Sequence, residues 1–150
     1  MDEKPIIFVD SNYWIYLFDK TTIEHESAKN YFNNLYDEAI LASNTVVMME
    51  VMHYLVKRLG PEMAKEKWEL FSSIDFVVGN LKFEDLDGIF STLCKYSHTG
   101  IGGRDATVLS FLENNQIQKI CTHDKAFKKI PNLEIIDPID DRKNQKKIKN

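Results

Sequence analysis

The feature that most constrains this chain is the alternation of short apolar runs with helical segments. Apolar runs rich in Ile, Val or Phe occur at residues 5–9, 74–78, 117–121 and 133–136, with a weaker one at 39–42. Nearly continuous apolar runs are typical of strands buried on both faces, as in parallel sheets. Because no hairpin signal separates them, the pattern predicts an α/β domain with helices on both faces of a parallel sheet.

Helical spacing fills the segments between these runs. Thr22 is expected to cap the second helix, and Gly60 to end the third. Pro61 stands where the first turn of a fourth helix tolerates proline. Helices are therefore expected at residues 14–18, 22–36, 45–59, 61–71, 83–93, 104–115 and 125–129.

Charge divides the chain of 150 residues unevenly. The net formal charge is −4, but residues 142–150 hold five basic side chains and no acidic one. The rest of the chain therefore has 14 basic and 23 acidic side chains, a formal charge of −9. We expect one domain over residues 1–141, followed by a frayed basic tail over residues 142–150. An acidic domain must bind any nucleic acid through local positive charge.

Cysteine usage and the chain's start favour a soluble cytoplasmic protein. Cys94 and Cys121 lie far apart and have neither metal-binding nor redox spacing, so we expect reduced thiols. Residues 1–5 lack the features of a signal peptide, and the apolar run at 45–56 is too short and too interrupted to span a membrane.

Three aspartates follow the predicted strands or begin the predicted helices. Asp10 follows the run at 5–9, Asp124 follows the run at 117–121, and Asp105 comes after the glycine-containing connector 98–103. Ligands of open parallel sheets bind outside the carboxyl ends of the strands, so all three are expected at one crevice. The alternative for each is a helix N-cap, a position that aspartate favours.

Glu50 lies in the predicted helix 45–59, which is apolar almost all round and is therefore expected to be buried. A buried carboxylate is costly unless it is paired or binds a metal. Glu50 either pairs locally with His53 or Lys57, or faces the same crevice as the aspartates.

Four carboxylates at one edge would repel one another, and a hard divalent cation would remove that conflict. A ligand set made only of oxygens suits Mg²⁺ or Mn²⁺ better than zinc. Such ions also bind phosphate oxygens, so hydrolysis of phosphodiester bonds is the natural chemistry of the predicted site.

Four short segments containing these acids resemble one protein family. They are IFVDSN at residues 7–12, TVVMMEV at 45–51, DA at 105–106 with Leu109, and THDKAF at 122–127. At these positions, and over residues 5–137 as a whole, the chain resembles the PIN-domain ribonucleases and, among them, the VapC-type toxins of toxin–antitoxin pairs. Each segment alone is a weak signal, but four in order at fitting spacing are fairly specific.

The resemblance implies a three-layer α/β/α domain with a five-stranded parallel sheet and a metal-dependent endoribonuclease activity on RNA. By position, Asp10, Glu50, Asp105 and Asp124 form the acidic cluster that binds Mg²⁺ or Mn²⁺ and carries catalysis. Asn12 and Thr122 are implied as supporting groups that orient Asp10 or the scissile phosphate. One metal ion is expected and a second is an alternative, because Ala126 stands where family members often carry a further acid.

The resemblance also implies partners: an RNA substrate, a small antitoxin and a second copy of the chain in a homodimer. Arg104, beside Asp105, is a candidate RNA-binding group, as are the lysines at 125, 128 and 129 and the basic tail. Methionines 48, 49 and 52 suit either a partner surface or the core.

Two other functions stay open, a housekeeping RNA-processing nuclease and a non-catalytic PIN-like module that binds RNA or protein. Other α/β families with an acid after the first strand fit poorly. The haloacid-dehalogenase pattern needs a second Asp where Asn12 stands, and a receiver domain needs an Asp after the third strand, where Gly79 and Asn80 stand.

Overall fold

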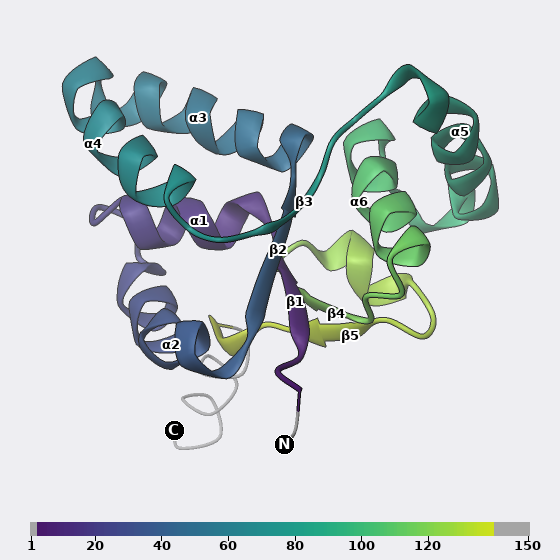
Figure 1. Cartoon of the computed structure of the whole chain (residues 1–150), viewed down its shortest axis with the longest axis horizontal. Helices are drawn as coiled ribbons and strands as arrows, with labels where there is room; N and C mark the ends of the chain where they lie inside the picture. The colour runs from purple at the N-terminus through teal and green to yellow at the C-terminus, as the bar shows by residue number, and fades with distance from the viewer. Residues whose placement is uncertain (1–2, 140–150) are drawn as a thin grey trace.

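Five short parallel strands form the middle layer of the computed structural model, which describes residues 3–139. The strand order is β3-β2-β1-β4-β5, and every pairing is parallel (Figure 1). The first strand of the chain is thus the central one, so its carboxyl end lies between those of β2 and β4. The strands are β1 (Ile6–Val9), β2 (Ile40–Asn44), β3 (Val77–Gly79), β4 (Lys119–Cys121) and β5 (Glu134–Ile136).

Helices cover both faces of this sheet, as the sequence predicts. Helices α1 to α4 lie on one side and α5 and α6 on the other (Figure 1). The five-stranded parallel sheet between two helical layers confirms the three-layer α/β/α prediction. The α-helices are α1 (Ser11–Phe18), α2 (His25–Glu38), α3 (Thr45–Leu59), α4 (Pro61–Ser72), α5 (Leu86–Lys95) and α6 (Gly103–Asn114), and the 3₁₀ helices are η1 (Phe83–Asp85), η2 (Ser97–Thr99) and η3 (Lys125–Lys129).

The two faces of β1 contact two separate hydrophobic clusters. Ile7 and Val9 belong to the cluster under α1–α4, whereas Phe8 belongs to the cluster under α6. The first cluster is centred on Trp14, whose ring is fully buried and lies 4.8 Å from the ring of Phe32. Burial on both faces explains why the sequence of β1 is an apolar run rather than an alternating one.

The third strand is shorter and later than predicted. The run 74–78 was expected to be a strand, but β3 spans only Val77–Gly79. The backbone amide of Ile74 bonds to the carbonyl of Phe71, which makes a turn after α4, and the ring of Phe76 packs on Trp14. The first part of the apolar run therefore fills the core from a loop.

The predicted cap of the second helix is also wrong. α2 begins at His25, and Thr22 lies in the preceding turn, where its hydroxyl donates to the carbonyl of Asp19. Thr22 therefore closes the turn between α1 and α2 instead of satisfying amides of the helix.

Helix α3 is amphipathic, which corrects the prediction of a fully buried helix. Val47, Val51 and Leu55 are buried, since α3 packs against α1 and α4 on that side. Met49 and Met52 are 62% and 41% exposed. Core filling is therefore not the role of these two methionines, and α3 presents an apolar stripe at the surface.

A hydrogen bond fixes α3 relative to the end of α1. The hydroxyl of Tyr54 donates to Asp19 Oδ2 at 2.6 Å, and the hydroxyl of Thr21 donates to Oδ1 at the same distance. Burial alone would raise the pKa of Asp19, but these donors hold it below its usual value. Since Glu50 lies one turn before Tyr54, this contact also helps to place Glu50.

Among residues 3–139, no helix has both the length and the apolar character that crossing a bilayer requires. The predicted domain boundary at residue 141 and the basic tail at 142–150 lie outside the described residues.

Gly79 is required at the end of β3 because a Cβ atom there would lie 2.5 Å from the ring of Phe111. We predict that Gly79→Ala lowers the free energy of unfolding by about 1–3 kcal/mol through overpacking. Gly88→Ala, within α5, is the matched control, because its Cβ would meet only the hydroxyl of Ser110 on α6, at 3.8 Å. There alanine should stabilise the helix by about 0.5–1 kcal/mol. Urea denaturation of both variants measures the difference, and equal effects would contradict the prediction.

Candidate functional site

The site begins with Asp10, at the carboxyl end of the central strand. Its backbone amide bonds to the carbonyl of Cys121, so the residue stands between β1 and β4. Its side chain is fully buried, and it accepts hydrogen bonds from the Ser11 amide at 2.8 Å and the Thr122 hydroxyl at 2.7 Å. Asp10 thus caps α1 and faces the crevice at once, so the two predicted roles do not exclude each other.

The guanidinium group of Arg104 binds three of the four predicted acids. Its Nε donates to Glu50 Oε1 at 2.5 Å and its Nη1 to Asp105 Oδ1 at 2.7 Å. Its Nη2 donates to Asp10 Oδ1 and to the hydroxyl of Ser11, the latter at 3.0 Å. Asp10, between β1 and α1, therefore meets side chains of α1, α3 and α6 at one point, which we call the acidic centre. The pairing of Glu50 with Arg104 replaces the predicted alternative of a local pair on α3.

The start of α6 explains why Arg104 and Asp105 reach this centre together. Asp105 is the third residue of the helix, and its Oδ2 accepts from the amide of Gly102 at 3.3 Å. A carboxylate in the first turn is favoured by the helix dipole. Arg104 precedes it in the same turn, so both side chains project to the carboxyl edge of the sheet.

The negative charge of the acidic centre is offset by a positive side chain of the same protein. Burial acts to lower the pKa of Arg104, but its three carboxylate partners outweigh burial and raise the pKa above its usual value. The guanidinium is thus a permanent cation among three acids. The repulsion expected from the sequence is offset by a residue of the chain itself.

Asp124 is placed differently from the other three acids. Its Oδ1 accepts from the amide of Ala126 at 2.9 Å and caps η3, and its backbone amide bonds to the hydroxyl of Thr122 at 3.1 Å. In the described part of the chain, its carboxylate is not among the groups that Arg104 binds. Its geometry here is that of the N-cap alternative, one hydrogen-bonded step from the acidic centre through Thr122.

Thr122 and Asn12 join the exit of β4 to the start of α1. The buried hydroxyl of Thr122 donates to Asp10 and accepts from Asn12 Nδ2 at 3.4 Å. The Oδ1 of Asn12 accepts from the amide of His123 at 3.3 Å. Both side chains thus lie where they can orient Asp10.

A further buried acid, Asp137, escaped the sequence reasoning. It accepts from the hydroxyl of Tyr13 at 2.5 Å, contacts His123 Nδ1 at 3.0 Å and pairs with Lys128 Nζ at 3.0 Å. His123 is part-buried in this cluster. Asp137 follows β5 directly, so the strand-exit argument used for Asp10 could have found it.

The acidic centre opens into a groove of about 840 Å³ along α3. Glu50 and Arg104 belong to its lining, so the charged groups are reachable from solvent. The groove is apolar at Met49 and carries basic side chains at Lys57 and Arg58.

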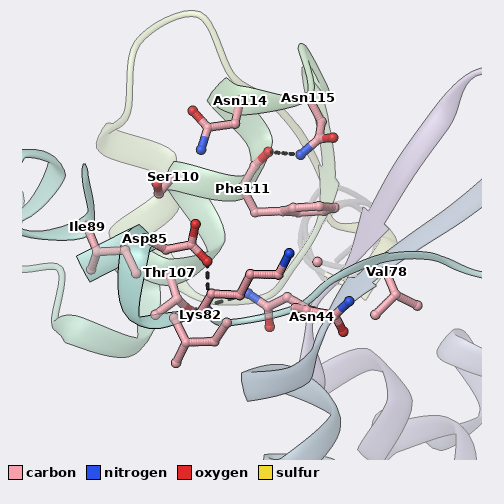
Figure 2. A pocket seen from close by; sticks show the side chains of 13 residues that line it. Asn44, Val78, Lys82, Asp85, Ile89, Thr107, Ser110, Phe111, Asn114 and Asn115 are labelled. Atoms are coloured by element: carbon pink, nitrogen blue, oxygen red, sulfur yellow. Dashed lines mark hydrogen bonds between the residues drawn. The ribbon is translucent and has the colours of Figure 1, made fainter. Parts of the chain in front are cut away.

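A smaller polar hollow of about 290 Å³ lies between the segment after β3 and α6 (Figure 2). Asn44, Lys82 and Asn114 are among its lining residues. Asn44 donates to the hydroxyl of Thr107 at 3.3 Å, and that hydroxyl donates to the carbonyl of Arg104 at 2.7 Å. The hollow therefore shares the first turns of α6 with the acidic centre.

The donor set fits a hard divalent cation by its chemistry. Three carboxylates with neighbouring hydroxyl groups offer only oxygen, the ligand that Mg²⁺ and Mn²⁺ prefer. Yet within residues 3–139 no three acidic, histidine or cysteine side chains are arranged around a common metal position. The carboxylates surround the guanidinium of Arg104 instead.

The comparisons with known proteins agree with this fold. Residues 7–133 match the PIN domain family. No curated protein sequence is significantly similar to the chain. Among solved structures, the chain is similar to VapC20 of Mycobacterium tuberculosis, a toxin that cleaves the sarcin-ricin loop. The identity is 20% and the TM-score 0.70, over 81% of this chain and 92% of that one.

Two complexes show the same likeness. VapBC2 of Rickettsia felis, solved with a fragment of its promoter DNA, is 20% identical with a TM-score of 0.68, over 87% of this chain and 97% of that one. FitAcB of Neisseria gonorrhoeae is 15% identical with a TM-score of 0.66, over 88% and 97%. At such identities the likeness concerns the fold.

The hydroxyl of Thr122 should be needed to hold Asp10 in place. We predict that Thr122→Val lowers the free energy of unfolding by about 1–3 kcal/mol, because a buried carboxylate oxygen and the Asp124 amide lose their partner. Thr92→Val is the matched control, because Thr92 is also buried but its hydroxyl donates to a carbonyl of its own helix. Denaturation in chelator compares the two, and equal losses would speak against a specific role of Thr122.

Proposed function

The chain belongs to the PIN domain family, and we propose that it is a metal-dependent endoribonuclease that hydrolyses RNA phosphodiester bonds. The observation that carries this proposal is the convergence of Asp10, Glu50 and Asp105 on one point at the carboxyl edge of the sheet. These residues come from distant parts of the sequence, and each stands in a segment that resembles a family motif. A cluster of this kind has no evident role in stabilising the fold, because it needs a counter-ion to exist.

In the proposed reaction, Asp10, Asp105 and Asp124 hold one Mg²⁺ or Mn²⁺ ion. The ion, when bound, supplies Lewis-acid polarisation of a phosphate oxygen and lowers the pKa of water. In such a hydrolysis water would attack the phosphorus in line, the bond to the 3′ oxygen would break, and the products would be a 5′-phosphate and a 3′-hydroxyl. To join this set, the carboxylate of Asp124 would have to turn from the cap of η3 towards Thr122, to which its backbone amide donates.

The other side chains of the site act by position. Glu50 is 40% exposed at the groove, where it can orient the attacking water. Thr122 and Asn12 hold Asp10. Arg104 lies between the acids and the groove, where its guanidinium can bind the scissile phosphate.

We further propose that the nuclease is the toxin of a toxin–antitoxin pair and forms a homodimer. The fold likeness to VapC20 and to the VapBC2 and FitAcB complexes supports this assignment. The groove beside the acidic centre and the exposed Met49 and Met52 of α3 offer a surface that a small antitoxin could cover. A housekeeping nuclease would share the chemistry but not the antitoxin.

RNA digestion tests the activity directly. The purified chain should cut RNA with Mg²⁺ or Mn²⁺ and stop when a chelator is added. We predict that Asp10→Asn and Asp105→Asn each reduce the cleavage rate by more than about a hundredfold, because each removes a charged group from the reacting centre. Asp87→Asn, on the exposed side of α5, is the matched control and should cut normally.

Cleavage by Asp10→Asn at the rate of the unchanged chain would refute the site assignment. Tight RNA binding without any cleavage would favour the non-catalytic module.

A further inference from the structure

We infer that Arg104 and a divalent metal ion occupy the acidic centre alternately, so that the metal must displace the guanidinium in order to bind. This inference rests on the proposed metal-dependent function and adds to it a residue that controls metal affinity.

The first argument is that every guanidinium nitrogen of Arg104 already binds a carboxylate. All three guanidinium nitrogens of Arg104 donate to carboxylates, one each on Glu50, Asp105 and Asp10. Nη2 also donates to the Ser11 hydroxyl. A planar guanidinium is the side chain best shaped to bridge several carboxylates at fixed angles. The centre is therefore already filled by a cation that matches it.

The second argument is that the two cations need the same oxygens. Asp10 and Asp105 are two of the proposed metal ligands, and the Oδ1 atoms of both accept from Arg104, as does Oε1 of Glu50 beside them. With the carboxylates so arranged, the described residues hold no position ready to coordinate a metal. A metal among these oxygens would also lie within a few ångströms of the guanidinium, and like charges so close repel strongly. Simultaneous binding is therefore excluded.

The third argument concerns the metal-free chain. Asp10 is fully buried, and a buried carboxylate without a counter-ion is strongly destabilising. Other basic side chains line the groove, but Lys57 and Arg58 do not pair with the three acids. Arg104 is thus the internal counter-ion that lets the centre form before any metal arrives.

Release of Arg104 needs no change of fold. The side chain is 26% exposed and lines the groove, so its guanidinium can rotate outward while α6 stays in place. Displaced into the groove, it stands beside the place where the phosphate of RNA is proposed to bind. Because the two cations compete for the same carboxylates, removing the guanidinium while keeping the carboxylates should strengthen metal binding.

The test is Mn²⁺ titration calorimetry on the full chain after removal of metals. We expect Arg104→Gln to bind Mn²⁺ at least about tenfold more tightly, because no charge-assisted hydrogen bonds need to be broken. Arg58→Gln is the matched control: it removes the same charge from the same groove, but Arg58 acts on Asp19 instead. Its Kd should change by no more than about twofold, since the exposed charge is screened.

Stability gives a second readout. In chelator, Arg104→Gln should have a lower Tm than the unchanged chain, because its three carboxylates then repel one another. Added Mn²⁺ should raise its Tm by more than it raises that of the unchanged chain.

The outcomes separate the two proposals. No Mn²⁺ binding by either protein would overturn the metal-dependent function itself. If Arg104→Gln binds Mn²⁺ with the same or a lower affinity, the inference that the metal must displace Arg104 is overturned and the nuclease proposal stands.

If Arg104→Gln does not fold, ¹⁵N NMR of the Arg104 guanidinium in the unchanged chain decides. Its Nε–H signal should shift on addition of Mg²⁺, and an unaltered signal at saturating Mg²⁺ would overturn the inference.

Discussion

One guanidinium group holds together the part of the molecule on which function depends. Without Arg104, the carboxylates of Asp10, Glu50 and Asp105 would face one another in a partly buried space where residues 3–139 place no other positive charge between them. The fold supplies the geometry by placing β1 at the centre of the sheet, so that side chains from both helical layers reach the same edge. Arg104, the residue before Asp105 in the sequence, then offsets the repulsion between the carboxylates. The position of β1 and the ion pairs of Arg104 are therefore both needed to bring the three carboxylates together.

Much of the fold could be predicted from the sequence because its strands are buried. The apolar run of β1 contacts hydrophobic clusters on both faces, and that double burial is what the pattern predicts. The predictions for β3 and α3 were wrong where apolar residues lie in a loop or at the surface. Phe76 fills the core from a loop, so a run that looks like a strand is only partly one. Helix α3 exposes Met49 at its surface, and composition alone does not tell a core helix from one with an apolar outer face.

The candidate site was predictable to the extent that it follows strand ends. That rule pointed to Asp10 and Asp124, whereas Asp105 was found at a helix start, and the rule also applies to Asp137, where it was not used. It could not predict which hydrogen bonds each carboxylate would make. Asp124 caps its own short helix by accepting from the Ala126 amide, whereas Glu50 reaches Arg104 across the crevice. Such choices depend on the distances between elements, which the sequence pattern does not contain.

The central position of β1 has a consequence for synthesis on the ribosome. Asp10 emerges early, but its neighbour strand β4 and the hydroxyl of Thr122 come more than one hundred residues later. Arg104 and Asp105 also emerge late, so a nascent chain holds Asp10 without the groups that surround it. The acidic centre is complete only when translation has passed residue 122. A chain made only as far as residue 103 therefore lacks Arg104 and Asp105, and any toxicity of the protein would begin only after the residues up to Thr122 have been made.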